Sequence, residues 1–318
     1  MDIGTHAAAR PGHPALINAA TGEVQSFAEL DARSNQLAHW LYAQGLRRGD
    51  HVALFMENTM NVLEIAWAGL RSGLYVTAVN RYLTADEAAY VIDDCDATVL
   101  IASHARAEVA AELPARLPRC RHYLMTDGTI DGWADYEAAI APCPTTRLAH
   151  EWCGETMLYS SGTTGRPKGV QRPLQDLTVA EGLRAAQLTA EYGFGRDTVY
   201  LCPAPLYHAA PLSFSLSVQH AGGTVVMMPR FDADAALEAI ERYRVTHSQW
   251  VPTMFVRMLK LPEERRRAFD LSSHVCAIHA AAPCPQEVKR AMIAWWGPIV
   301  HEYYGATESN GMTRITAT

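Results

Sequence analysis

The sequence has no long apolar segment and no excess of basic residues, and these two absences exclude whole classes of protein. No apolar run approaches the roughly 18 residues that a membrane span needs, and Met1 to Pro14 contains no apolar core of a secretory signal. The 27 lysines and arginines are outnumbered by 34 acidic residues, which gives a formal net charge of −7. Nucleic-acid-binding proteins normally carry a basic face. We therefore expect no membrane span, no nucleic-acid partner and a cytoplasmic location.

The sequence also lacks cysteine pairs at the spacing of metal ligands, and it lacks the motifs of nucleophilic hydrolases. No two of its seven cysteines stand at metal-ligand spacing, and their odd number argues against a disulfide framework. There is no Gly-x-Ser-x-Gly turn and no sign of a Ser/His/Asp triad. A zinc site, a disulfide scaffold and covalent serine catalysis are therefore not expected.

What the sequence does contain is an alternation of apolar strands and amphipathic helices over 318 residues, 49% of them hydrophobic. Strands and helices that alternate in this way predict mostly parallel sheets covered by helices on both faces. A helix is expected over Val62–Leu70. The strand candidates are His51–Phe55, Tyr75–Val79, Thr98–Ala102, Thr156–Leu158, Thr198–Cys202, Thr224–Met228, His247–Val251, Cys276–Ala280 and Met312–Thr318.

Local signals fix two helix starts and one domain boundary. Ser26 with Glu29, and Thr84 with Glu87, have the spacing of a capping box, in which a hydroxyl and a carboxylate satisfy each other's backbone donors. The stretch 142–155 has two prolines, small polar residues and weak periodicity. We therefore expect an α/β fold of two stacked α/β subdomains, residues 1–150 and residues 151–318.

The most informative segment is the glycine-rich loop from Ser160 to Gly169, which follows an apolar strand. Its ten residues hold three glycines, four hydroxyl groups, Arg166 and Lys168. Glycines let backbone N–H groups turn inward, and such a concavity, lined by hydroxyls, binds phosphate. The loop is not a Walker A sequence, because the fifth residue after Gly162 is Pro167 rather than Gly. An ordinary surface loop is the alternative for a segment of this composition.

The segment Tyr159–Val170 resembles the signature phosphate loop of the adenylate-forming (AMP-binding) superfamily, which includes acyl-CoA synthetases, luciferases and the adenylation domains of peptide synthetases. Three later segments occur in that family's order: Pro205–His208, His279–Pro285 and His301–Glu308. The family often has Gly where Ala280 or Ala281 stands here. The resemblance covers roughly residues 13–318.

The resemblance implies a nucleotide site shared by three of these segments. Tyr304 would stack on adenine, Thr307 would contact the α-phosphate, and Glu308 would hold Mg²⁺; an aromatic ring and a hard carboxylate suit these roles. The catalytic residues would be Lys168, Thr164, His208 and Glu308. The residues that would bind ATP are Ser160, Ser161, Gly162, Thr163, Thr164, Gly165, Lys168, Ala281, Ala282, Pro283, Glu302, Tyr303, Tyr304, Gly305 and Thr307.

The same resemblance places an acyl pocket beside His208. Its other candidate residues are Trp250, Val251, Met254 and Ala280, although an apolar strip of this kind is as often core as pocket. Family members that activate α-amino acids carry an Asp shortly after the position of His208. The stretch 208–222 contains no Asp or Glu, and an unpaired ammonium would be costly to bury there. The substrate is therefore expected to be a hydrophobic carboxylic acid.

Together these features predict the N-terminal domain of an acyl-CoA synthetase-like enzyme that uses ATP, Mg²⁺ and coenzyme A to convert an acid to acyl-AMP and then to acyl-CoA. The chain ends soon after Glu308, so we expect the family's C-terminal domain, with its adenylation lysine, to be absent from it and the chain alone not to complete the reaction. Two alternatives stay open: an acyl-AMP ligase that delivers to a carrier protein, and a non-catalytic ATP- or acyl-binding module. The oligomeric state also stays open, a homodimer included.

Overall fold

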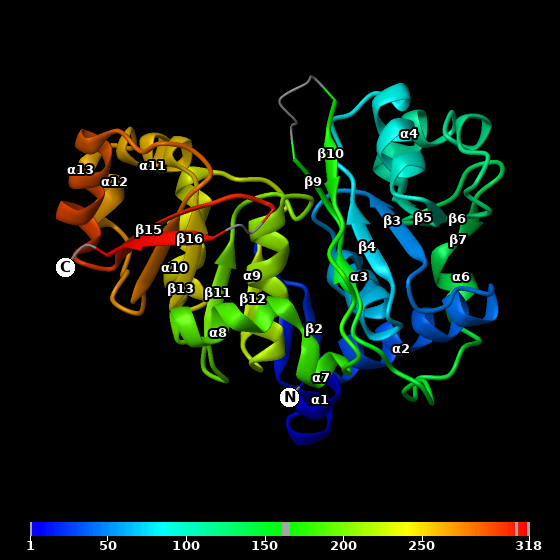
Figure 1. Ribbon diagram of the computed structural model, residues 1–318. Helices are drawn as coiled ribbons and strands as arrows, with labels where there is room; N and C mark the ends of the chain where they lie inside the picture. Colours follow the sequence, from blue (N-terminus) through cyan, green and yellow to red (C-terminus); the bar gives the residue numbers. More distant parts are fainter. Residues whose placement is uncertain (1, 161–165, 309–310, 317–318) are drawn as a thin grey trace.

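The computed structural model describes residues 2–160, 166–308 and 311–316. These residues form two large sheets and one two-stranded hairpin. Figure 1 shows the two sheets as neighbouring lobes, with the hairpin standing between them. The predicted fold class, mostly parallel sheets covered by helices, is confirmed.

The helices and strands are as follows. The α-helices are α1 (Ile3–Ala9), α2 (Phe27–Ala43), α3 (Asn61–Arg71), α4 (Ala85–Asp94), α5 (Ala107–Ala110), α6 (Tyr136–Ile140), α7 (Val179–Gly182), α8 (Gln187–Tyr192), α9 (Ala209–His220), α10 (Ala233–Arg242), α11 (Pro252–Leu259), α12 (Glu263–Arg267) and α13 (Gln286–Trp296). Short 3-10 turns are η1 (His104–Arg106), η2 (Pro114–Arg116) and η3 (Arg184–Ala186). The strands are β1 (Pro14–Asn18), β2 (Val24–Ser26), β3 (His51–Phe55), β4 (Tyr75–Ala78), β5 (Ala97–Ser103), β6 (His122–Thr126), β7 (Ala134–Asp135), β8 (Glu155–Thr156), β9 (Leu158–Ser160), β10 (Lys168–Val170), β11 (Val199–Cys202), β12 (Thr224–Met227), β13 (His247–Trp250), β14 (Cys276–His279), β15 (Val300–Gly305) and β16 (Met312–Ile315).

The first sheet has six parallel strands in the order β7-β6-β5-β3-β4-β8. Successive side chains of a strand point to opposite faces, and β3 shows the consequence. Val52 and Leu54 pack in the core between the two sheets, whereas Ala53 and Phe55 pack in a separate core under α4. A strand buried on both faces reads as a continuous apolar run, which is why the sequence predicts β3 with its observed bounds.

The second sheet has eight strands in the order β16-β15-β14-β13-β11-β12-β1-β2. Its pairs are parallel except at the two edges, where β2 runs antiparallel to β1 and β16 antiparallel to β15. The N-terminal strands β1 and β2 thus join the sheet formed by the second half of the chain, while β8 joins the first sheet. The sheets exchange strands across residue 150, so the subdomain boundary there stays a prediction.

The two lobes share one core. Residues from α2, α3 and the first sheet pack with residues from α9 and the second sheet in a single cluster. The far faces of the sheets have their own cores, one under α4 and the other under α10, α11 and α13. Inside the shared core, the indole Nε1 of Trp67 on α3 donates to Oε1 of Gln219 on α9 at 2.7 Å. Helices and sheets therefore alternate in layers through the molecule.

The two capping boxes are found where the sequence places them, whereas one predicted strand is not. Both capping boxes are present, at the start of α2 and at the start of α4. The predicted strand Thr156–Leu158 is a correction: the chain leaves the first sheet after Thr156 and starts the hairpin at Leu158. Met157 sits at that change of sheet, its N–H bonded to the carbonyl of Val76.

Among the residues that the structure describes, no helix combines the length and the apolar character needed to cross a membrane.

Candidate active site

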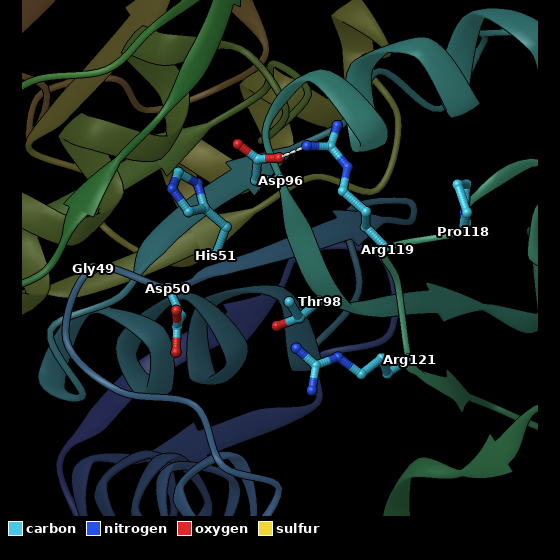
Figure 2. A pocket seen from close by; sticks show the side chains of 8 residues that line it. All are labelled: Gly49, Asp50, His51, Asp96, Thr98, Pro118, Arg119 and Arg121. Carbon is cyan, nitrogen blue, oxygen red and sulfur yellow. Dashed lines mark hydrogen bonds and ion pairs between the residues drawn. The ribbon is translucent and has the colours of Figure 1, made fainter.

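Two hollows in the described part of the chain lie at opposite ends of parallel strands, one in each sheet. One, of about 510 Å³, lies at the amino ends of β3, β5 and β6 and is drawn in Figure 2. Two aspartates and two arginines line it, and one of these arginines, Arg119, forms ion pairs with Asp93 and Asp96. His51 is buried against Tyr75, with ring centroids 4.6 Å apart. Its balanced and partly paired charges give this hollow no clear chemistry.

The other hollow, of about 640 Å³, lies where ligands bind in open α/β sheets. It is lined by residues at the carboxyl ends of β11, β13, β14 and β15, from Ala204 to Gly305, together with the hairpin side of the first sheet. The strand order reverses beside β11, because β12 lies on one side of it and β13 on the other. Such a reversal leaves a crevice outside the carboxyl ends of the strands. This hollow is therefore the candidate site.

The glycine-rich loop connects the two strands of the hairpin. β9 and β10 pair antiparallel, and Ser160 lies opposite Lys168. The loop thus starts and ends at one point, with a hydroxyl and an exposed ammonium side by side on the ladder. Five of the predicted ATP contacts lie outside the described residues: Ser161, Gly162, Thr163, Thr164 and Gly165.

The structure brings the hairpin to the segment that follows β15, 148 residues later in the chain. Oγ of Ser160 donates to Oε1 of Glu308 at 3.4 Å. The guanidinium of Arg172, two residues past β10, donates to the carbonyl of Thr307. Two sequence segments predicted to bind phosphate and a metal ion therefore meet at one edge of the hollow.

The predicted adenine segment follows β14. Ala281 lines the hollow and has φ +76°, the left-handed region that favours glycine. The ring of Tyr304 is 81% exposed and open to stacking, while Tyr303 lies inward and lines the hollow. Ala282 and Pro283 are exposed beside this segment.

Glu302 is already engaged in the structure. Its Oε2 accepts from Nζ of Lys289 at 2.6 Å and lies 3.9 Å from Nε2 of His279. His279 is fully buried, and burial lowers its pKa to about 4. Because the His279 ring is neutral, it adds no charge next to the Lys289–Glu302 ion pair. Contact between Glu302 and adenine therefore requires this pair to open or to be shared.

His208 stands at the N-cap of α9, on the wall of the hollow. Desolvation lowers the pKa of His208, so its ring is neutral at neutral pH. Ala209, Ala210 and Ser213 follow on the same helix and leave room along its exposed face. Opposite them, Nε2 of Gln249 donates to the hydroxyl of Tyr303 at 3.1 Å.

The other predicted pocket residues divide between the hollow and the core. Trp250, Val251 and Ala280 line the hollow. Met254 does not: α11 turns its side chain into the outer core of the second sheet, where the indole of Trp250 also packs against Phe255 and Trp296. The reason is that α11 covers the face of the sheet away from the other lobe.

The hollow also contains charged residues that sequence reasoning missed. Nε of Arg184 bonds Oε2 of the buried Glu155 at 2.6 Å. Arg172 and Glu191 lie on the same lining. None stands in a recognisable motif, because each reaches the site only through the pairing of distant segments.

The residues of this site suit Mg²⁺ bound to a triphosphate rather than Mg²⁺ alone. No group of three or more His, Cys, Asp or Glu side chains in the described part of the chain is placed to hold a metal ion. Glu308 alone is therefore not a metal site, but Mg²⁺ usually takes one or two carboxylates together with substrate phosphates. A carboxylate, a hydroxyl and Lys168 on two adjoining segments fit a cation bound to a triphosphate.

Comparison with known proteins agrees with this arrangement. The chain matches the family described as AMP-binding enzyme over residues 4–318. It is 34% identical over 316 residues to 4-coumarate--CoA ligase-like 5 of Oryza sativa subsp. japonica, covering 96% of this chain and 57% of the relative. It is 33% identical over 290 residues to feruloyl-CoA synthase of Amycolatopsis sp, covering 91% of this chain and 55% of the relative.

Solved structures share the fold. The N-terminal domain of FACL13 from Mycobacterium tuberculosis superposes with a TM-score of 0.83 at 25% identity, covering 96% of this chain and 75% of that one. A putative long-chain-fatty-acid CoA ligase from Rhodopseudomonas palustris also gives 0.83, at 22% identity, covering 99% of this chain and 77% of that one. The chain spans about half the length of the curated relatives it matches, 52% for 4-coumarate--CoA ligase-like 6 of Oryza sativa subsp. japonica.

Proposed function

We propose the function of this chain from one premise: it belongs to the AMP-binding enzyme family. The proposed activity is the ATP-dependent conversion of a hydrophobic carboxylic acid to acyl-AMP, followed by transfer of the acyl group to coenzyme A. The family supports ATP and CoA as substrates. The role of Mg²⁺ and the nature of the acid rest on the site of this chain.

The observation that carries the proposal is the meeting of the hairpin and the β15–β16 segment. Ser160 and Lys168 on the hairpin supply a hydroxyl and a cation, and Glu308 supplies a carboxylate. These groups lie beside the hollow at the carboxyl ends of the parallel strands, and that hollow is large enough for a small acid. Neither segment alone has this chemistry.

The first half-reaction needs positioned charge rather than a nucleophilic side chain. A carboxylate oxygen of the acid attacks the α-phosphorus of ATP, the bond from that phosphorus to the bridging oxygen breaks, and pyrophosphate leaves. Lys168 and the hydroxyl of Ser160 bind phosphoryl oxygens in this proposal, and Tyr304 offers its exposed ring to adenine. A divalent cation held by Glu308 would neutralise charge on the phosphates. His208, neutral and at the N-cap of α9, orients the acid.

The second half-reaction transfers the acyl group. The thiolate of coenzyme A attacks the carbonyl carbon of acyl-AMP, the bond to the phosphate oxygen breaks, and AMP leaves. Between α9 and β15 the hollow is lined by Phe214 and Tyr303, whose rings stack with centroids 6.2 Å apart. This apolar wall and the absence of acidic residues over 208–222 favour an acid without an α-amine. The relatives named for 4-coumarate and ferulate make aromatic acids the first to test.

Nucleotide binding tests the phosphate site directly. We expect a non-hydrolysable ATP analogue with Mg²⁺ to bind the 318-residue chain in calorimetry, and Lys168→Ala and Glu308→Gln each to weaken it about tenfold or more. Arg119→Leu removes an arginine from the other hollow and serves as the control with unchanged affinity. Absence of binding to the unaltered chain would contradict the proposal.

The acid is tested with non-hydrolysable acyl-adenylate mimics. We expect cinnamoyl or fatty acyl mimics to bind more tightly than the ATP analogue, since they fill the hollow as well as the nucleotide site. An α-aminoacyl mimic that binds best would show that the pocket has been misassigned. Offering acyl-AMP to the protein with either coenzyme A or a phosphopantetheinyl carrier protein then identifies the acceptor.

A further inference from the structure

We propose that Arg172 is a positioning residue of the nucleotide site, one that holds the Thr307–Glu308 turn against the glycine-rich hairpin. This inference rests on the proposed function and adds a residue that lies in none of the segments assigned above. Arg172 follows β10 by two positions, where the chain leaves the hairpin.

Arg172 is anchored to the first lobe through its backbone. Its carbonyl accepts a hydrogen bond from the hydroxyl of Tyr75 at 2.6 Å. Tyr75 lies in β4, buried to 6% exposure and stacked on His51. The anchor is therefore a buried side chain of the first sheet, and its hydrogen bond restrains the position of the Arg172 backbone.

The side chain of Arg172 reaches the second lobe. Its Nη2 donates to the carbonyl of Thr307, 135 residues away in sequence. A hydrogen bond from a guanidinium to a carbonyl is stronger than a neutral one. Arg172 is thus bonded to Tyr75 through its carbonyl and to Thr307 through its side chain. We call this link between the two sheets, at the rim of the hollow, the strut.

The strut controls the residues assigned to phosphate and metal binding. Thr307 and Glu308 follow β15 on a turn, and the hydrogen bond from Ser160 of the hairpin to Glu308 is long, at 3.4 Å. A bond of that length orients a side chain weakly. Fixing the Thr307 carbonyl restrains the backbone from which both side chains project, so the groups are arranged before the nucleotide arrives.

The test combines hydrogen exchange with binding. In Arg172→Met we expect backbone amides of Gly305–Glu308 to exchange faster in the unliganded chain, and the ATP analogue with Mg²⁺ to bind about tenfold more weakly. Arg172→Lys keeps one donor and the charge, and should recover part of both effects. Arg47→Met is the matched control, since Arg47 also bonds a backbone carbonyl, that of Tyr42 at 2.9 Å, far from the hollow.

The outcomes separate the inference from the function on which it rests. Wild-type affinity and unchanged exchange in Arg172→Met would overturn the strut alone. Weaker binding with unchanged exchange would also overturn it, because the arginine would then act directly on the nucleotide. If the unaltered chain binds no ATP analogue, the proposed function falls and the strut with it. Should Arg172→Met unfold at a much lower temperature than Arg47→Met, the Arg172→Lys data decide.

Discussion

At the scale of single residues, the backbone of Ala281 is the clearest example of strain in the site. This residue sits in the left-handed region with φ +76°, which costs an L-residue other than glycine about 1–2 kcal/mol. The family often has glycine at one of the two positions 280 and 281, and this conformation supplies a reason. Strained backbone of this kind is found at ligand sites, where the surrounding structure holds it in place.

Ala281→Gly should therefore stabilise the protein. The relief of strain is partly offset by the greater freedom of glycine in the unfolded chain, so we expect a net gain of roughly 1 kcal/mol or less. Urea unfolding measures it as a higher midpoint with an unchanged slope. Ala282→Gly is the control: Ala282 is not among the described residues with positive φ, so this change should destabilise. A loss of stability in both variants would contradict the strain.

A second residue-scale prediction concerns His274, which is buried beneath the second sheet. Its Nε2 shares a 2.6 Å hydrogen bond with Oγ of Ser248, and burial lowers its pKa from 6.5 to about 3. The unfolded chain therefore binds more protons than the folded chain between these two values. The part of the unfolding free energy that depends on His274 is fully present above pH 6.5 and is lost as the pH drops below it.

The expected loss from His274 is about 2 kcal/mol at a pH of about 5. His220 and His279, whose pKa values burial lowers to about 4, add to the same slope. His274→Gln should flatten the dependence of the unfolding free energy on pH by about one proton, whatever it does to stability at neutral pH. An unaltered slope in His274→Gln would show that this ring binds protons equally well in the folded and the unfolded chain.

At the scale of helices and strands, the sequence predicts local elements well where burial is two-sided. The apolar run His51–Phe55 coincides with β3, and Ser26 with Glu29 begins α2 as expected. These features depend on residues within a few positions of one another. Thr156–Leu158 failed as one strand because two sheets compete for it, and no local pattern records that competition.

The candidate site divides in the same way. Short segments such as Tyr304–Glu308 can be recognised by their order along the chain, so sequence alone brings their chemistry to notice. The meeting of Ser160 with Glu308, and of Arg172 with Thr307, depends on pairings across more than 130 residues. The resemblance predicted Met254 in the pocket, but the direction of its side chain is decided by the core that α11 covers.

At the scale of the whole molecule, the two lobes are held together by buried polar contacts as well as by the shared core. Asn58 lies in the loop before α3, with 7% of its surface exposed. Its Nδ2 donates to the carbonyls of Ala204 and Met228, both at 3.0 Å, and its Oδ1 accepts from N–H of Leu206 at 2.8 Å. One side chain of the first lobe thus satisfies three backbone groups of the second.

Asn58→Ala should loosen this junction and the site beside it. It leaves two carbonyls and one N–H without their partner in a buried place, so we expect a loss of about 3 kcal/mol in the free energy of unfolding. Leu206 and Ala204 belong to the loop that leads to His208. Loss of the Asn58 hydrogen bonds should therefore make the position of His208, on the wall of the acid pocket, less fixed. Binding of a cinnamoyl-adenylate mimic should weaken more than binding of the ATP analogue, since Ser160 and Glu308 are left intact. Asn80→Ala, which removes a single local bond to the N–H of Tyr82, is the matched control and should cost less than about 1 kcal/mol. Equal costs in the two variants would mean that the hydrogen bonds of Asn58 contribute no more to the junction than a local surface bond does.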